Sequence, residues 1–140
     1  MPARQRNIPP GGTRGTVFKH VAHVRLEDAA VLLEQKRYAG AIYLAGYSVE
    51  CLLKWAVTRR RAQIYLAASF EIHDLGALVK EAGLEAILRE ETELRDVFWA
   101  LVDTWSPELR YLAKAPDAGR ARSLYGQIVR VYDWIAEHIV

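Results

Sequence analysis

The sequence predicts an all-α protein, an up-and-down four-helix bundle with one or two extra short helices. The main observation is the stretch from Ala39 to Ala56, which is apolar or small on nearly every side and carries only two charged residues, Glu50 and Lys54. Such a pattern is typical of a helix that neighbouring helices cover on several sides. Apolar residues recur at the helical period in most of the remaining chain, and no segment shows the clean alternation of a β-strand.

The first main helix is expected to begin at a Thr16 cap and to end near Gln35. Its apolar residues, Val17 and Val31 among them, nearly follow the helical period and are expected on the buried side. A short link then leads to the central helix, so the two helices should be antiparallel neighbours.

The central helix is expected to end near Arg60, and the sequence leaves residues 61–72 open between more helix and a loop. His73 or Asp74 should cap a short helix, because an apolar-periodic run follows them. Gly83 should end that helix, since glycine adopts the backbone conformation of a helix stop most easily.

Residues 84–105 are expected to form another main helix, and a break at residues 90–92 is left open. A helix stop and a new start are expected at residues 105–108, where Ser106 should cap a helix of about one turn and Pro107 should take its first position. Asp117 should cap the last main helix. The apolar residues expected on the buried side of that helix are Leu124, Ile128, Val131 and Ile135, and Trp134 is a further candidate.

Length and composition fit one globular domain, because a chain of 140 residues with 51% hydrophobic and 26% charged residues can bury a substantial core. Residues 1–15 are rich in proline, glycine and arginine, so we expect a flexible basic N-terminal arm there. Residues 16–140 form the expected helical domain.

Several function classes are disfavoured by simple observations. The arm has no apolar run of the kind found in secretory signals, and no stretch is long and apolar enough to span a membrane, so a cytoplasmic protein without membrane contact is expected. The lone Cys51 excludes an intramolecular disulfide. His20 and His23 lie one helical turn apart, but no further ligand nearby completes a metal site, so no metal or other cofactor is expected.

Three stretches of the chain, in the same order, resemble the HEPN superfamily. Residues 41–54 read AIYLAGYSVECLLK, similar to the aromatic-Gly-Tyr-x-x-Glu-x-x-Leu-Lys pattern of the family's second helix. Residues 72–75 and 105–111 are the other two. The resemblance implies a HEPN-like helical bundle over residues 16–140. It also implies a homodimer that binds nucleotide or RNA at a cleft associated with the dimer.

The resemblance also implies a set of ligand-binding residues. Lys54 and Arg110 would receive phosphate, while Tyr111 would stack on a base. The alternative is structural, because Glu50 and Lys54 stand four residues apart and can pair along the helix, and Glu50 can also pair with Arg110. The residues that match the family pattern are Glu50, Lys54, His73, Asp74, Arg110 and Tyr111.

Catalysis is left open, and no catalytic residue is assigned. Many HEPN proteins are metal-independent ribonucleases, including toxins partnered with a small nucleotidyltransferase antitoxin, and they place an Arg four to six residues ahead of a His in the last main helix. Here Arg130 and His138 have seven residues between them, which separates them by about 12 Å and about 80° along a helix. A rearranged site could draw on His73, Arg110, Arg130 or His138.

We therefore expect a nucleotide-binding or RNA-binding module without evident efficient catalysis. The alternatives are a metal-independent, toxin-like endoribonuclease and a protein-interaction partner of a small nucleotidyltransferase.

Charge and aromatic content bear on partners. Residues 1–61 hold eleven Lys or Arg against four Asp or Glu, while the remaining residues hold eight against thirteen. This asymmetry could form a basic face for an anionic partner, or it could help one subunit dock on another.

Four tryptophans and seven tyrosines are many for so small a bundle, which favours a homodimer, although a larger core or a ligand pocket is the alternative place for them. The aromatic residues considered for that interface are Trp99, Trp105, Trp134, Tyr125 and Tyr132.

Overall fold

The computed structural model describes residues 12–105 and 116–139, and it confirms the all-α class. Within these residues there is no strand, and a single isolated β-bridge joins Arg14 and Tyr65. None of the described helices is both long and apolar enough to cross a membrane. The elements are α1 (Gly15–Glu34), α2 (Tyr38–Arg60), the 3-10 helix η2 (Ala68–Phe70), α3 (Leu75–Glu81), α4 (Glu85–Arg89), α5 (Thr92–Thr104) and α6 (Ala118–His138).

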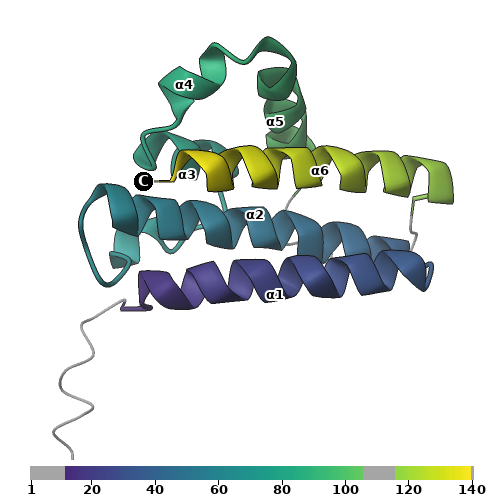
Figure 1. Cartoon of the computed structure of the whole chain (residues 1–140), viewed down its shortest axis with the longest axis horizontal. Coiled ribbons are helices and arrows are strands. Elements are labelled where there is room, and N and C mark those ends of the chain that lie inside the picture. Colours follow the sequence, from purple (N-terminus) through teal and green to yellow (C-terminus); the bar gives the residue numbers. More distant parts are fainter. Residues whose placement is uncertain (1–11, 106–115, 140) are drawn as a thin grey trace, which may run out of the picture.

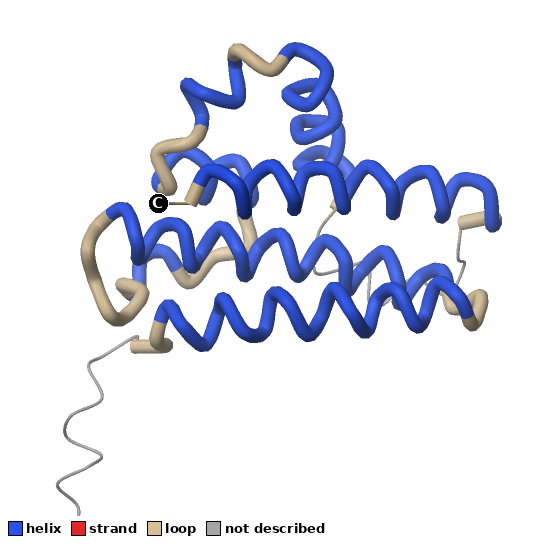
Figure 2. Tube along the Cα trace, viewed as in Figure 1, coloured by secondary structure: helices blue, strands red, loops and turns tan. Residues whose placement is uncertain are grey.

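Three long helices lie side by side with α2 in the middle, and the shorter α4 and α5 project beyond α6, whereas α3 packs against α2 (Figures 1 and 2). Helix α1 runs antiparallel to α2, whereas α6 runs in the same direction as α2 (Figure 1). The start of α1 and the C-terminal ends of α2 and α6 therefore meet at one end of the molecule.

Helix α2 is buried along most of its length, as the sequence predicts. Helices α1, α3 and α6 all pack against it. A small residue of α2 also allows close contact with Trp105, which follows α5, because a Cβ atom added at Gly46 would overlap its indole ring. The buried residues of α2 are Ala41, Ile42, Ala45, Gly46, Ser48, Val49, Glu50, Cys51, Leu52, Leu53, Lys54, Ala56, Val57 and Thr58.

Helix α1 begins at Gly15, so the predicted Thr16 cap is wrong. Arg14 occupies the cap position without a side-chain hydrogen bond. Tertiary contact fixes this start, because the Gly15 amide donates to the carbonyl of Ile64 at 2.9 Å. Ile64 lies in the loop after α2, so this bond could not be predicted from the residues next to Gly15 in the sequence.

The buried side of α1 also differs from the prediction. Val17 is 45% exposed and Val31 is 58% exposed. Ala22 and Ala29 are fully buried instead. The long apolar residues at the margins of the stripe therefore stay partly in solvent, while the small residues face the core.

The segment that joins α2 to α3 is mostly turn and loop. Helix α2 ends at Arg60, and η2 is the only helical element between it and α3. Residues 84–105 adopt the broken alternative, since α4 ends at Arg89 and α5 begins at Thr92. A fourth long helix is thus replaced by a short helix followed by a helix of 13 residues.

Three helix-end predictions are confirmed. The carboxylate of Asp74 accepts a hydrogen bond from the Ala77 amide at 3.1 Å, and Asp117 accepts one from the Arg120 amide at 2.9 Å. Gly83 follows the last turn of α3 with φ of 75°, the left-handed conformation that glycine adopts without strain. The predictions for residues 1–11 and 106–115, including the Ser106 cap and the turn after it, lie outside the described residues.

Substitution of two helical glycines tests this packing. Gly46→Ala should lower the free energy of unfolding by about 1–3 kcal/mol, because the new methyl group forces the Trp105 indole away from α2. Gly126→Ala is the matched control, since a Cβ atom there meets nothing within 4 Å, and it should raise stability by up to about 1 kcal/mol. Urea denaturation measures both changes. Equal changes in the two variants would contradict the close approach of Trp105.

Candidate functional site

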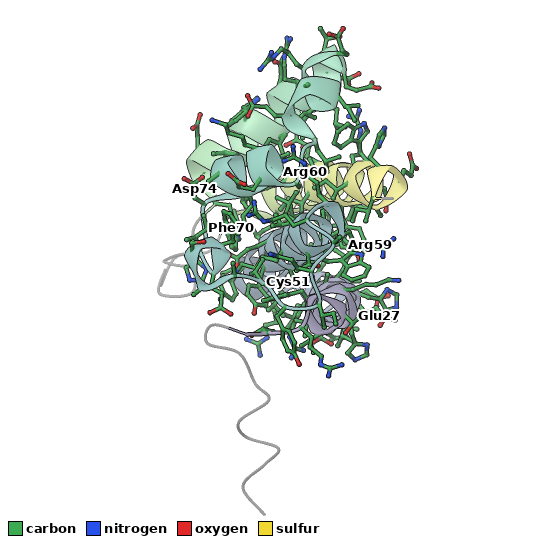
Figure 3. The ribbon with its side chains drawn as sticks, turned by 90° about the vertical axis from the view of Figure 1, so that its left-hand side faces the viewer. Glu27, Cys51, Arg59, Arg60, Phe70 and Asp74 are labelled. Atoms are coloured by element: carbon green, nitrogen blue, oxygen red, sulfur yellow. The ribbon has the colours of Figure 1, made fainter. Side chains whose placement is uncertain are left out.

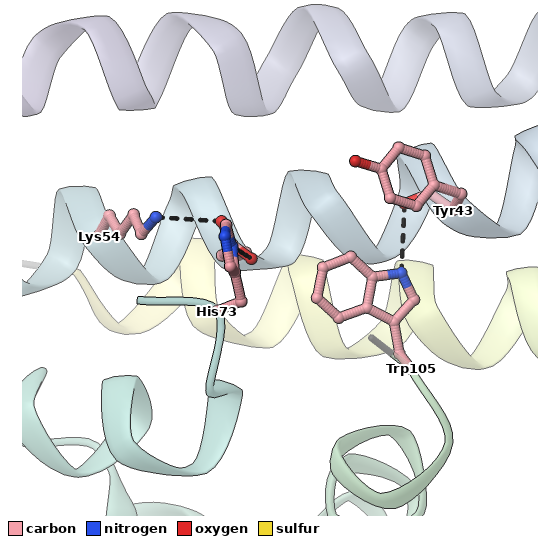
Figure 4. A network of polar contacts seen from close by, with 5 residues as sticks. Tyr43, Lys54, His73 and Trp105 are labelled. Carbon is pink, nitrogen blue, oxygen red and sulfur yellow. Dashed lines mark hydrogen bonds and ion pairs between the residues drawn. The ribbon is translucent and has the colours of Figure 1, made fainter. Parts of the chain in front are cut away.

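The structure brings three of the predicted ligand residues into direct contact. Glu50 is completely buried in α2. One of its carboxylate oxygens accepts a hydrogen bond from Lys54 Nζ at 3.0 Å, and the other lies 3.0 Å from Nδ1 of His73 (Figure 4). Because a carboxylate only accepts, His73 Nδ1 carries the proton in this bond.

The contacts around Glu50 match the structural role that is the alternative to ligand binding, in which Glu50 pairs with Lys54. A buried carboxylate is costly unless charged or hydrogen-bonding groups satisfy it, and here both oxygens have a partner. Lys54 is 6% exposed, and its ammonium group lies 5.4 Å from the ring centroid of Phe18 on α1. Lys54 is therefore held inside the helix layer, where a phosphate has little access to it.

The remaining predicted ligand residues have other positions. The side chain of His73 is 57% exposed, so its outer edge faces solvent. Asp74 caps α3, and Arg110 and Tyr111 lie outside the described residues. A ligand role for the whole set stays a prediction.

The weak catalytic candidates of α6 are not brought together. Arg130 lies 3.4 Å from the carboxylate of Glu93 on α5. His138 stacks on Trp134 with ring centroids 4.2 Å apart, and its Nδ1 lies 2.8 Å from the Trp134 carbonyl oxygen. Since a carbonyl only accepts, the proton is on Nδ1 and the basic nitrogen of His138 is Nε2.

A second surface, which we call the basic groove, has the composition of an anion site. It is a cavity of about 840 Å³ where α1, α2 and α6 meet. It is lined by Thr16, Lys19, His20, His23, Leu52, Trp55, Arg59, Tyr132, Ala136 and Ile139.

The groove combines positive charge with aromatic surface. Lys19 Nζ lies 5.3 Å from the centroid of the Trp55 ring, and Arg59 Cζ lies 5.5 Å from it. None of the described residues that line the groove is acidic, although His23 pairs with Glu27 beside it at 3.4 Å. Both permanent cations are thus positioned around one indole ring.

Glu50, Lys54 and His73 together form what we call the Glu50 network. The basic groove and the Glu50 network lie on different sides of α2. Trp55 follows Glu50 by five residues, which is a rotation of about 140° around a helix. Figure 3 shows the same separation, with Arg59 and Asp74 on opposite sides of α2. A ligand in the groove therefore does not contact Glu50.

A smaller cavity, which we call the adjoining pocket, continues from the groove. Its volume is about 440 Å³, and it shares Arg59 and Ile139 with the groove. Arg60 and His138 add positive or hydrogen-bonding groups to it. Arg60 is held in place, because its guanidinium donates to the carbonyl of Glu81 at 3.0 Å.

The groove was not assigned from the sequence. Lys19, Trp55, Arg59 and Tyr132 come from three helices, and only the excess of cations in residues 1–61 pointed to such a face. Among the described residues, no group of three or more His, Cys, Asp or Glu is placed to hold a metal ion.

Comparisons of the chain with protein-family models, curated proteins and solved structures gave no match. The HEPN resemblance therefore stays a prediction from the sequence motifs.

Removal of Lys54 tests the structural role of the Glu50 network. Lys54→Met should lower the free energy of unfolding by about 3–5 kcal/mol, because the buried carboxylate loses its cation. Adding Glu50→Gln in the same chain should recover much of this loss. His73→Gln should cost less, since His73 is largely exposed. Chemical denaturation gives the values, and a Lys54→Met variant as stable as the parent would show that Glu50 does not depend on Lys54.

The lone cysteine predicts a change of stability at alkaline pH. Burial raises the pKa of the Cys51 thiol to about 11, whereas a thiol in an unfolded chain ionises near a pH of about 8.5. Between these values the unfolded chain loses the proton first, so the free energy of unfolding should fall as pH rises.

Cys51→Ala should make this fall shallower, and the slope is the readout, not the absolute stability. Burial also raises the pKa of Tyr47, which contributes at higher pH in both proteins. Denaturation curves at pH 8, 9 and 10 measure the slopes. Identical slopes would contradict the raised pKa.

Proposed function

We propose that this protein is a HEPN-type helical module that binds nucleotide or RNA and has no evident efficient catalysis. The observation that carries the proposal is the basic groove, where Lys19 and Arg59 flank Trp55. Trp55 is half-buried. Cations beside an aromatic ring are the combination that proteins use for single-stranded nucleic acid.

In this proposal the two permanent cations of the groove, Lys19 and Arg59, bind phosphate. The guanidinium group of Arg59 can form two parallel hydrogen bonds to phosphate oxygens, whereas Lys19 acts as a point charge. None of the described residues that line the groove carries negative charge. Binding should therefore weaken steeply with salt.

In this proposal Trp55 stacks on a base, and Tyr132 is a second aromatic residue in the groove. Stacking on an aromatic ring contributes about 1–3 kcal/mol per base and is tolerant of sequence. The apolar floor of the groove includes Leu52 and Ala136, which suits a base or ribose better than a fully hydrated ion.

The proposal includes a homodimer with a HEPN-like arrangement of the bundle. Its support is the antiparallel pair α1 and α2 joined to α6, together with apolar residues left at the surface. Trp99 is 38% exposed and Ile87 is 44% exposed, and aromatic residues are enriched in interfaces. Trp105 and Trp134 are buried, so they do not support the dimer. A small nucleotidyltransferase is the alternative occupant of such a surface.

A metal-independent endoribonuclease is the second candidate, favoured by one observation. His138 Nε2 is the basic nitrogen, and its side chain lines the adjoining pocket with Arg59 and Arg60. In such a reaction Nε2 takes the proton of a ribose 2'-hydroxyl while the 2' oxygen attacks phosphorus. The bond between phosphorus and the 5' oxygen breaks, the 5' oxygen takes a proton from water, and a 2',3'-cyclic phosphate remains. The arginines hold the charged phosphate.

Titration of a labelled single-stranded RNA by fluorescence anisotropy tests the binding proposal. Lys19→Ala should weaken binding about threefold to tenfold, as expected for a lost contact of roughly 0.5–1.5 kcal/mol. It should also lower the dependence of log K on log salt by about 0.7. Arg122→Ala removes the same charge from an exposed position of α6 outside the groove and is the control.

Two further results decide between the candidates. Equal weakening by Lys19→Ala and Arg122→Ala would contradict the groove as the site. Incubation of the same RNA in EDTA reports on catalysis, since cleavage that His138→Gln abolishes would favour the ribonuclease.

A further inference from the structure

The basic groove is continuous with the adjoining pocket at the C-terminal ends of α2 and α6. It meets the adjoining pocket at Arg59 and Ile139, which line both cavities. With volumes of about 840 and 440 Å³, each falls within the size range of a small-molecule site. A mononucleotide in the groove would therefore leave the adjoining pocket unused.

The two cavities repeat the same chemistry. Lys19 lines the groove, Arg59 lines both cavities, and Arg60 lines the adjoining pocket. No acidic side chain occurs among the described lining residues of either cavity. Cations in both of two connected cavities suit a ligand that carries more than one negative charge.

The adjoining pocket is organised around Arg60. Its guanidinium donates to the carbonyl of Glu81, which fixes its direction. A Cβ atom added at Gly83 would lie 2.7 Å from Arg60 Nε, so a side chain there would displace Arg60 from its present position. His138 lines the same pocket and is itself fixed by its stack on Trp134 and by the bond of its Nδ1. Both polar side chains are thus held in position before any ligand arrives.

We propose that the ligand of this surface is a single-stranded oligonucleotide that crosses from the basic groove into the adjoining pocket. One phosphate contacts Lys19 and Arg59, and a following phosphate contacts Arg60 and His138. Trp55 stacks on a base in the groove. This inference rests on the proposed function, and it adds that the chain length of the ligand, beyond a single nucleotide, contributes to affinity.

The test is a length series with the full-length protein. Uridine monophosphate and oligouridylates of two, four and eight nucleotides compete with a labelled octamer, and anisotropy gives each affinity. Affinity should rise at least tenfold from the mononucleotide to the tetramer. The salt dependence should become steeper in parallel, because each added phosphate contact in a single strand contributes about 0.7 to the slope.

Variants separate the two subsites. Lys19→Ala should weaken every ligand in the series, whereas Arg60→Gln and His138→Gln should weaken the tetramer and octamer at least threefold and leave the mononucleotide unchanged. Arg60→Lys keeps the charge and should retain most of the binding. Arg122→Gln is the surface control, and circular dichroism checks that each variant is folded.

Two outcomes overturn the inference. If the mononucleotide binds as tightly as the octamer, or if the Arg60 and His138 variants weaken no ligand, the strand does not enter the adjoining pocket, although the proposed function stands. If no ligand of any length binds, the proposed function fails together with the inference.

Discussion

The buried carboxylate of Glu50 is the constraint on which the centre of the molecule depends. It stands in a helix that neighbours cover on several sides, so its charge must be satisfied by residues inside the layer. Lys54 does this from the next turn of α2, and His73 does it from the segment before α3. The bond from His73 therefore ties the chain after α2 back onto α2, and it fixes where α3 can begin.

This arrangement divides α2 into two sides with different roles. On one side the polar atoms are used up in holding the structure together, as the positions of Lys54 and Glu50 show. On the other side, Trp55 and Arg59 line the basic groove. Because α6 runs in the same direction as α2, the ends of both helices reach the same end of the molecule and extend this surface to His138 (Figure 1).

Local patterns predicted much of the fold. The continuous apolar stretch predicted a buried α2, and the Asp74 and Asp117 caps followed from short-range chemistry. The pair of Glu50 and Lys54 followed from their spacing on a helix. The start of α1 was missed because it depends on the carbonyl of Ile64, a residue far away in the sequence.

The site was harder to predict than the fold for the same reason. The groove assembles side chains from α1, α2 and α6, and no single segment carries a recognisable motif for it. The most direct measurement of where a ligand binds is a ¹⁵N NMR titration of the four tryptophan indoles with single-stranded RNA. We expect the Trp55 signal to shift at the lowest RNA concentrations, while the Trp105 signal, whose indole donates to the carbonyl of Tyr43, stays in place. A shift of Trp105 with Trp55 unchanged would place the ligand elsewhere and contradict the basic groove as the binding surface.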